Sequence, residues 1–185
     1  MANKRQLTGG TDDVNPQYLS AAVTQTGTDA FTQLTLGTPI VRVGTDSSGS
    51  ATIMEVLKVY FDLPIPDTTA AAATLRSAIM CITTSSGTGT TITPFSDPKV
   101  LAQFRRDNVN AFTAGGTGVL QMEHGPHVMD LTDGAGHGVL VAVDNLFLEC
   151  NTSGMSEAKT FRVKILYRFK KVKLVEYIGI VQSQQ

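Results

Sequence analysis

Between Lys159 and Phe169 apolar and charged residues alternate almost without exception, and this pattern constrains the fold more than any other feature. A β-strand has a side-chain period of two, so alternate residues of the segment share one face. One face would then carry only apolar side chains: Phe161, Val163, Ile165, Tyr167 and Phe169. The other face would be basic, with Leu166 as the single apolar exception, and would carry Arg162, Lys164, Arg168 and Lys170. The segment predicts a strand that is buried on one side.

The rest of the chain consists of short extended segments between turn residues. Thr and Val suit a pleated surface, and the 17 glycines supply turns. In 51–63, one face would carry Ile53, Leu57, Val59 and Phe61, and the other Met54, Val56 and Tyr60; a helical period is the alternative there. We expect strands over 30–43, 51–63, 75–83, 119–125, 126–134, 138–150, 159–169 and 173–181. The sequence of 138–150 and of 173–181 is apolar on both faces, which is typical of covered strands.

One helix is expected among these strands, over residues 97–106. Asp97 would cap it and Pro98 would occupy its first position. The preceding segment, 84–97, is a loop longer than most connections, which favours a surface or functional role. This pattern predicts an all-β protein, a sandwich or barrel of eight to ten strands with one short helix. We expect two parts: a polar N-terminal arm over 1–29, ordered only if the domain or a partner holds it, and one domain over 30–185.

Charge is distributed unevenly along the chain, although the net charge is only −1. Seven of the 15 basic residues lie between Lys159 and Lys173, and none occurs over 107–158. Such a face can contact phosphates, pair with an acidic segment of a neighbouring subunit, or simply be solvated. The segment brings no cluster of aromatic residues to this face, so stacking on bases is not expected. The residues predicted to face nucleic acid are Lys4, Arg5, Lys159, Arg162, Lys164, Arg168, Lys170, Lys171 and Lys173.

No catalytic or metal-binding pattern is visible, and we expect neither an enzyme nor a cofactor. His124, His127 and His137 match no zinc spacing, so we interpret them as loop histidines. Asp130 and Asp133 are the carboxylates that would suit calcium between subunits, the one cofactor alternative. Cys81 and Cys150 lie in apolar segments and are expected to pack as small hydrophobic residues. The glycine-rich segments 87–91 and 114–118 lack the features of a phosphate-binding loop and are interpreted as turns.

The chain-wide pattern resembles the single jelly-roll coat proteins of small icosahedral viruses. It shares a polar arm, about eight strands, long Thr/Gly/Ser loops and one short helix after DPKV. The final residues, FRVKILYRFKKVKLVEYIGIVQSQQ, are similar to coat-protein endings from uncultured small circular single-stranded DNA viruses. The resemblance implies a single jelly-roll β-sandwich that self-assembles into a shell of about 60 copies, or a multiple, around single-stranded DNA or RNA. Many such coats have an Arg-rich arm, whereas this arm offers only Lys4 and Arg5.

Three other functions remain open from the sequence. One is a ligand- or carbohydrate-binding β-sandwich, although the chain has no Trp and 6% aromatic residues. Another is a phage tail or head-decoration protein, and the last is a cupin-type metalloenzyme. The chain has no run of about 18 apolar residues, and its start, MANKRQLTGGTDD, lacks an apolar core. We therefore expect no membrane partner and no signal peptide. The resemblance to coat proteins implies a protein that is made in the host cell and located in the virion.

Overall fold

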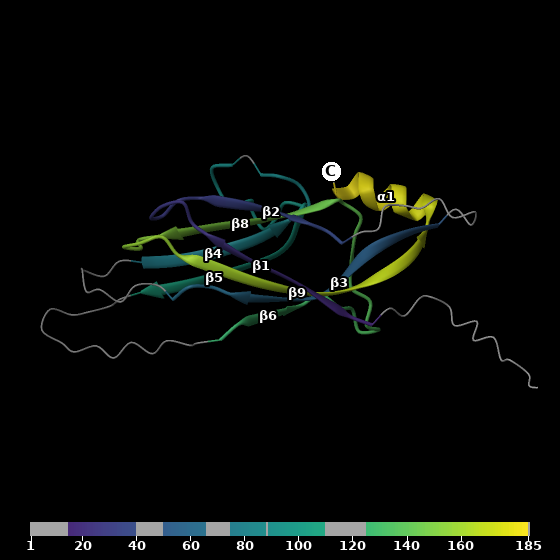
Figure 1. Ribbon diagram of the computed structural model, residues 1–185, viewed down its shortest axis with the longest axis horizontal. Helices are drawn as coiled ribbons and strands as arrows, with labels where there is room; N and C mark the ends of the chain where they lie inside the picture. The colour runs from purple at the N-terminus through teal and green to yellow at the C-terminus, as the bar shows by residue number, and fades with distance from the viewer. Residues whose placement is uncertain (1–14, 40–49, 66–74, 88, 110–124, 185) are drawn as a thin grey trace, which may run out of the picture.

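The computed structural model describes residues 15–39, 50–65, 75–87, 89–109 and 125–184, which form two packed antiparallel sheets and one helix (Figure 1). Sheet A has the order β1-β9-β3-β6, and β7 pairs with β3 beside β6. Its strands are β1 (Gln17–Thr24), β9 (Thr160–Lys173), β3 (Ser50–Asp62), β6 (His127–Asp130) and β7 (Val139–Val141). Sheet B has the order β2-β8-β4-β5, with strands β2 (Thr32–Gly37), β8 (Asn145–Ser153), β4 (Leu75–Thr83) and β5 (Val100–Val109). Helix α1 (Leu174–Gln184) ends the described chain.

The order of the strands makes this sandwich a jelly roll. The chain crosses repeatedly between the two sheets, and the whole of β1 pairs with β9, which lies far from it in sequence. The two four-stranded paths each combine early and late strands, as the double Greek key of a jelly roll requires. The expected all-β jelly-roll sandwich is confirmed, as are the predicted strands at 51–63, 75–83 and 159–169.

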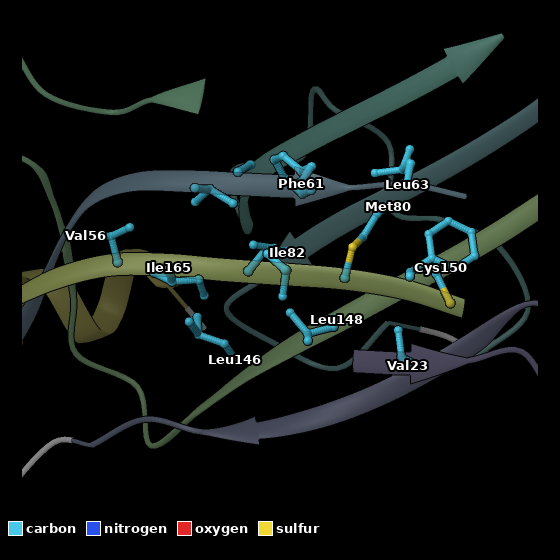
Figure 2. Packing of buried hydrophobic residues seen from close by; sticks show 14 of the residues in the cluster. Val23, Val56, Phe61, Leu63, Met80, Ile82, Leu146, Leu148, Cys150 and Ile165 are labelled. Atoms are coloured by element: carbon cyan, nitrogen blue, oxygen red, sulfur yellow. The ribbon is translucent and has the colours of Figure 1, made fainter. Parts of the chain in front are cut away.

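The core lies between the two sheets. Sheet A contributes the alternate residues predicted for β9, and Phe161 and Ile165 are fully buried. Figure 2 shows Val56 and Ile165 of sheet A close to Ile82, Leu146 and Leu148 of sheet B. Burying such a side chain stabilises the fold by about 1.5–3 kcal/mol, so the period-two apolar pattern largely determines which face of each strand turns inward.

The predicted faces of the third strand are confirmed after residue 57 and wrong before it, because β3 contains a bulge. Val56 pairs with Tyr167, but Lys58 pairs with the next residue, Leu166, so Leu57 is an extra residue. An extra residue shifts the alternation by one position. Met54 and Val56 therefore point into the sandwich before the bulge, and Val59 and Phe61 do so after it; Ile53 lies on the outer face instead.

The segment 138–150 is two strands rather than the expected single strand. β7 pairs with β3 in sheet A, whereas β8 pairs with β2 and β4 in sheet B. The residues between them, 142–144, carry the chain from one sheet to the other. Residues 138–150 are apolar on both faces because the two halves of the segment belong to different sheets. They do not form one strand that is buried on both faces.

The expected helix over 97–106 is wrong. The side chain of Asp97 accepts a hydrogen bond from the backbone amide of Lys99 at 2.9 Å, and its carbonyl accepts one from Val100 at 3.0 Å. This is a tight turn that leads directly into β5. Asp and Pro favour such turns as much as helix starts, so the sequence signal was ambiguous.

The expected strand over 173–181 is also wrong, since residues 174–181 belong to helix α1. Its inward face has helical spacing: Tyr177, Ile180 and Val181 pack against Ala51 and Ile53 on the outer face of sheet A. The Gln184 side chain accepts from the amide of Ala142 at 3.0 Å and donates to the carbonyl of Leu140 at 2.6 Å. Figure 1 shows α1 at the end of the sandwich toward which β3 and β9 curve.

Part of the expected polar arm, Gln17–Thr24, forms strand β1 and pairs with β9. These residues are therefore a strand of the sandwich rather than part of an arm that precedes it. Residues 1–14, which include Lys4 and Arg5, lie outside the described residues. So do His124, the turn expected at 114–118 and all but the last residue of the strand expected over 119–125. In the part of the chain that the structure describes, no helix is long and apolar enough to span a bilayer.

Candidate nucleic-acid interface

The basic face predicted from the sequence lies on the outer side of sheet A. Because β9 runs between β1 and β3, its outward side chains lie in the middle of the sheet. The structure brings four of the predicted residues together there: Arg162, Lys164, Arg168 and Lys170. The other described residues lie apart from this row: Lys159 near the start of β9 beside Glu157, Lys171 on the alternate side of the strand and Lys173 at its end.

One half of this face is neutralised by a buried carboxylate, Glu55. Arg168 Nε donates to Glu55 Oε2 at 2.5 Å, and Lys170 Nζ lies 3.6 Å from Oε1. The amide of Gly138 also donates to Oε1, at 2.9 Å. Glu55 is fully buried and the Arg168 side chain is 23% exposed. Arg168 and Lys170 therefore hold the sheet and the 131–138 loop together, and they offer little free charge to an outside ligand.

Burial raises the pKa of Glu55, but its hydrogen bonds from Arg168 and Gly138, together with the charges of Lys170 and Arg168, outweigh burial and hold the pKa below its ordinary value of 4.5. A carboxyl whose pKa is lower in the folded state stabilises the fold above the unfolded-state pKa. That stabilisation is lost as the pH falls through the folded-state pKa.

Acidification is therefore expected to weaken the fold below about pH 5, and Glu55→Gln is expected to flatten that part of the stability profile. The variant would be less stable than the parent at pH 7, because the buried ion pair is broken. Urea unfolding midpoints measured from pH 7 to pH 3 test this. Equal acid slopes in the two proteins would contradict the assignment to Glu55.

The other half of the face is more open and carries two tyrosines. In register, Tyr60 of β3 lies opposite Lys164, and Tyr18 of β1 lies opposite Leu166. The Lys164 ammonium is 4.6 Å from the centre of the Tyr18 ring, and the two tyrosine rings meet edge to face at 6.2 Å. Arg162 is 64% exposed, with Asp62 at 3.7 Å.

These tyrosines correct the expectation that the basic face has no aromatic cluster. Sequence reasoning considered one strand at a time, and neither Tyr18 nor Tyr60 is near the basic segment in sequence. Only the pairing of β9 with both β1 and β3 brings them together. The signal that could have found them is that both strands have an aromatic residue at an outward position.

The other candidate residues do not converge on a site. His137 Nδ1 lies 3.1 Å from Asp133 Oδ2, while His127 stacks on Phe104 with ring centres 3.9 Å apart. Asp130 contacts Lys58 at 2.8 Å, which holds the pKa of this carboxyl well below its usual range. Among the described residues, no group of three or more His, Cys, Asp or Glu side chains is placed to hold a metal ion.

Both cysteines are buried and free, as expected of small hydrophobic residues. Burial raises the pKa of the Cys81 thiol and of the Cys150 thiol to about 12. Both thiols therefore stay protonated at neutral pH, and a protonated thiol is a poor nucleophile.

The long loop over 84–97 folds back across the outer face of sheet B. Buried Glu149 of β8 accepts hydrogen bonds from the amide of Thr93 at 2.7 Å and from its hydroxyl at 2.9 Å. Gln103 of β5 donates to the Thr93 carbonyl at 3.1 Å. Phe95, beyond this anchor, is 69% exposed. The loop thus covers the outer face of sheet B around Glu149 and Gln103, whereas Tyr18 on the outer face of sheet A is 55% exposed.

Comparison with known proteins supports the fold assignment. No family model matches the sequence, and no curated protein is significantly similar to it. Among solved structures, VP1 of Trichodysplasia spinulosa-associated polyomavirus in complex with GM1 oligosaccharide is 10% identical, with a TM-score of 0.55 over 90% of this chain and 97% of that chain. The Merkel cell polyomavirus virus-like particle is 11% identical, with a TM-score of 0.51 over 94% and 81%. At such low identity the likeness shows a shared jelly-roll fold.

Proposed function

We propose that this protein is the coat protein of a small virus, that it self-assembles into an icosahedral shell, and that it is located in the virion. One observation carries the proposal: the likeness to a polyomavirus VP1 jelly roll covers 90% of this chain and 97% of that chain. A similar chain was solved as a virus-like particle, which supports homo-oligomeric assembly. The shell encloses the viral genome, which we propose to be single-stranded DNA or RNA.

The protein also exposes apolar residues that a subunit contact would cover. Leu174, Val175 and Ile178 of α1 are 42%, 83% and 48% exposed. Exposed apolar patches of this kind commonly mark interaction sites. In a closed symmetric shell, the same patch is buried once in every subunit, so its contribution to assembly is repeated around the particle.

Electron microscopy of the purified full-length protein, with absorbance at 260 and 280 nm, tests the proposal. Uniform closed particles are expected, with a 260-nm signal that survives nuclease. If the protein stays a monomer or dimer even after single-stranded DNA is added, the coat-protein proposal is wrong, and a ligand-binding β-sandwich becomes the better assignment.

Val175→Asp is expected to abolish particle formation while leaving the fold intact. Val175 is 83% exposed in the single chain, so the substitution is tolerated there, but a buried charge in each subunit contact opposes assembly. Light scattering after size-exclusion chromatography gives the mass, and thermal melting reports the fold. Ser183→Asp, which adds the same charge at an exposed position of the same helix outside this patch, is the matched control. If Val175→Asp forms particles of parental size, α1 does not contribute to the subunit contact.

A further inference from the structure

The open half of the sheet A face has the composition of a base-stacking site. A hollow of about 290 Å³ is lined there by two tyrosines, two basic side chains and three other residues: Tyr18, Tyr60, Arg162, Lys164, Asp62, Pro126 and Val163. Tyr18 is 55% exposed, on the edge strand β1 beside the basic row of β9. A large aromatic ring that remains this accessible, beside two cations, offers apolar area and positive charge to the same ligand.

Register explains why these side chains form one surface. Lys164 projects between the two tyrosines, directly opposite Tyr60 across the β3–β9 pair. Arg162 lies two residues along the same strand, on the same face. Neighbouring outward positions on a strand are about 7 Å apart, which is close to the distance between successive phosphates of an extended single strand. The row therefore suits a backbone with its bases turned toward the sheet.

We infer that this surface binds single-stranded nucleic acid by stacking an unpaired base on Tyr18, beside Tyr60, while Lys164 and Arg162 contact the adjacent phosphates. The inference rests on the proposed function, in which the shell encloses a single-stranded genome. It also assigns different roles to the two halves of the basic face. Arg168 and Lys170 are occupied by buried Glu55, whereas Arg162 and Lys164 remain accessible beside the tyrosines.

Single strands are favoured over a duplex because stacking needs a base that is free on one side. Base–aromatic stacking tolerates any base, since every base has a π-face, so we expect weak sequence preference. The cation beside the ring adds a salt-dependent contribution, because each neutralised phosphate releases counterions. Stacking and charge can thus be separated by measuring affinity at several salt concentrations.

The test is fluorescence anisotropy of a fluorescein-labelled oligothymidylate with the unassembled full-length protein and its variants. Tyr18→Ala is expected to weaken binding about tenfold and to leave the salt dependence unchanged. Tyr18→Phe, which keeps the ring, is expected to bind within about twofold of the parent. Lys164→Gln is expected to reduce the slope of log affinity against log salt by about 0.7. Phe95→Ala and Lys99→Gln, which change an aromatic and a basic residue near sheet B, are the matched controls.

Two results would overturn the inference: parental affinity in Tyr18→Ala, or equal affinity of the parent for a duplex of the same length. Microscopy on the same preparations keeps this outcome distinct from the proposed function. If the protein forms particles but its binding does not depend on Tyr18, the stacking site is wrong and the coat-protein proposal is still supported. Tyr18-dependent binding by a protein that never forms particles would support the site and disprove the coat.

Discussion

Replacing Arg168 by methionine is expected to lower the free energy of unfolding by about 3 kcal/mol, because it leaves the buried Glu55 carboxylate without its main partner. Glu55 is fully buried, and the Arg168 guanidinium donates a hydrogen bond to its carboxylate at 2.5 Å. Lys170, at 3.6 Å, compensates only in part. Methionine keeps the apolar stem of the side chain, so the loss reports the charge rather than packing. Urea unfolding at pH 7 measures it.

The same strand offers a matched control for this prediction. Arg162→Met removes an arginine from the same face, but its partner Asp62 is 52% exposed and 3.7 Å away. An exposed pair of this kind contributes about 0–1 kcal/mol. The double variant Glu55→Met with Arg168→Met removes both charges and is expected to recover much of the loss. If Arg168→Met and Arg162→Met lower the free energy of unfolding by the same amount, the ion pair of Arg168 with buried Glu55 does not stabilise the fold as proposed.

Gly138→Ala is expected to destabilise the protein by about 3 kcal/mol, through overpacking against the backbone and a weakened hydrogen bond to a charged group. A Cβ at this position would lie 2.1 Å from the carbonyl oxygen of Val56 and 2.8 Å from its carbonyl carbon. Backbone cannot move aside as a flexible side chain can. The displaced loop would also pull the Gly138 amide away from Glu55.

Gly134→Ala is the control, because it lies in the same loop and an added Cβ would meet nothing within 4 Å. We expect a change within about 0.5 kcal/mol there, as for most surface substitutions. Thermal and urea unfolding of both variants measure the difference. If Gly138→Ala is as stable as Gly134→Ala, the close approach of the loop to the β3 bulge is wrong.

Sequence reasoning was most successful where one local pattern determines the structure. The alternation in β9 predicted both its buried face and its basic face, because a period of two is a direct consequence of strand geometry. Continuous apolar segments did not distinguish a strand from a helix. The sequence of 173–181 is equally apolar read as a strand or as a helix, and only packing of Tyr177 and Ile180 on sheet A decides between them.

Features that depend on how strands pair with one another could not be predicted from the sequence. The bulge at Leu57 depends on the register of β3 against β9, and it exchanges the two predicted faces of the strand before that residue. The same holds for the site. Individual basic residues could be placed on a face, but their division into a half bound by Glu55 and a half beside Tyr18 and Tyr60 depends on which strands pair with β9.

The mass of the assembled particle tests the central claim most directly. Native mass spectrometry of the purified full-length protein, with and without added single-stranded DNA, measures it. A closed icosahedral shell of this 19.7-kDa chain requires about 60 copies or a multiple, so we predict a particle of about 1.2 MDa or more, plus any enclosed nucleic acid. A protein that remains at the mass of one or two chains under both conditions would contradict the account.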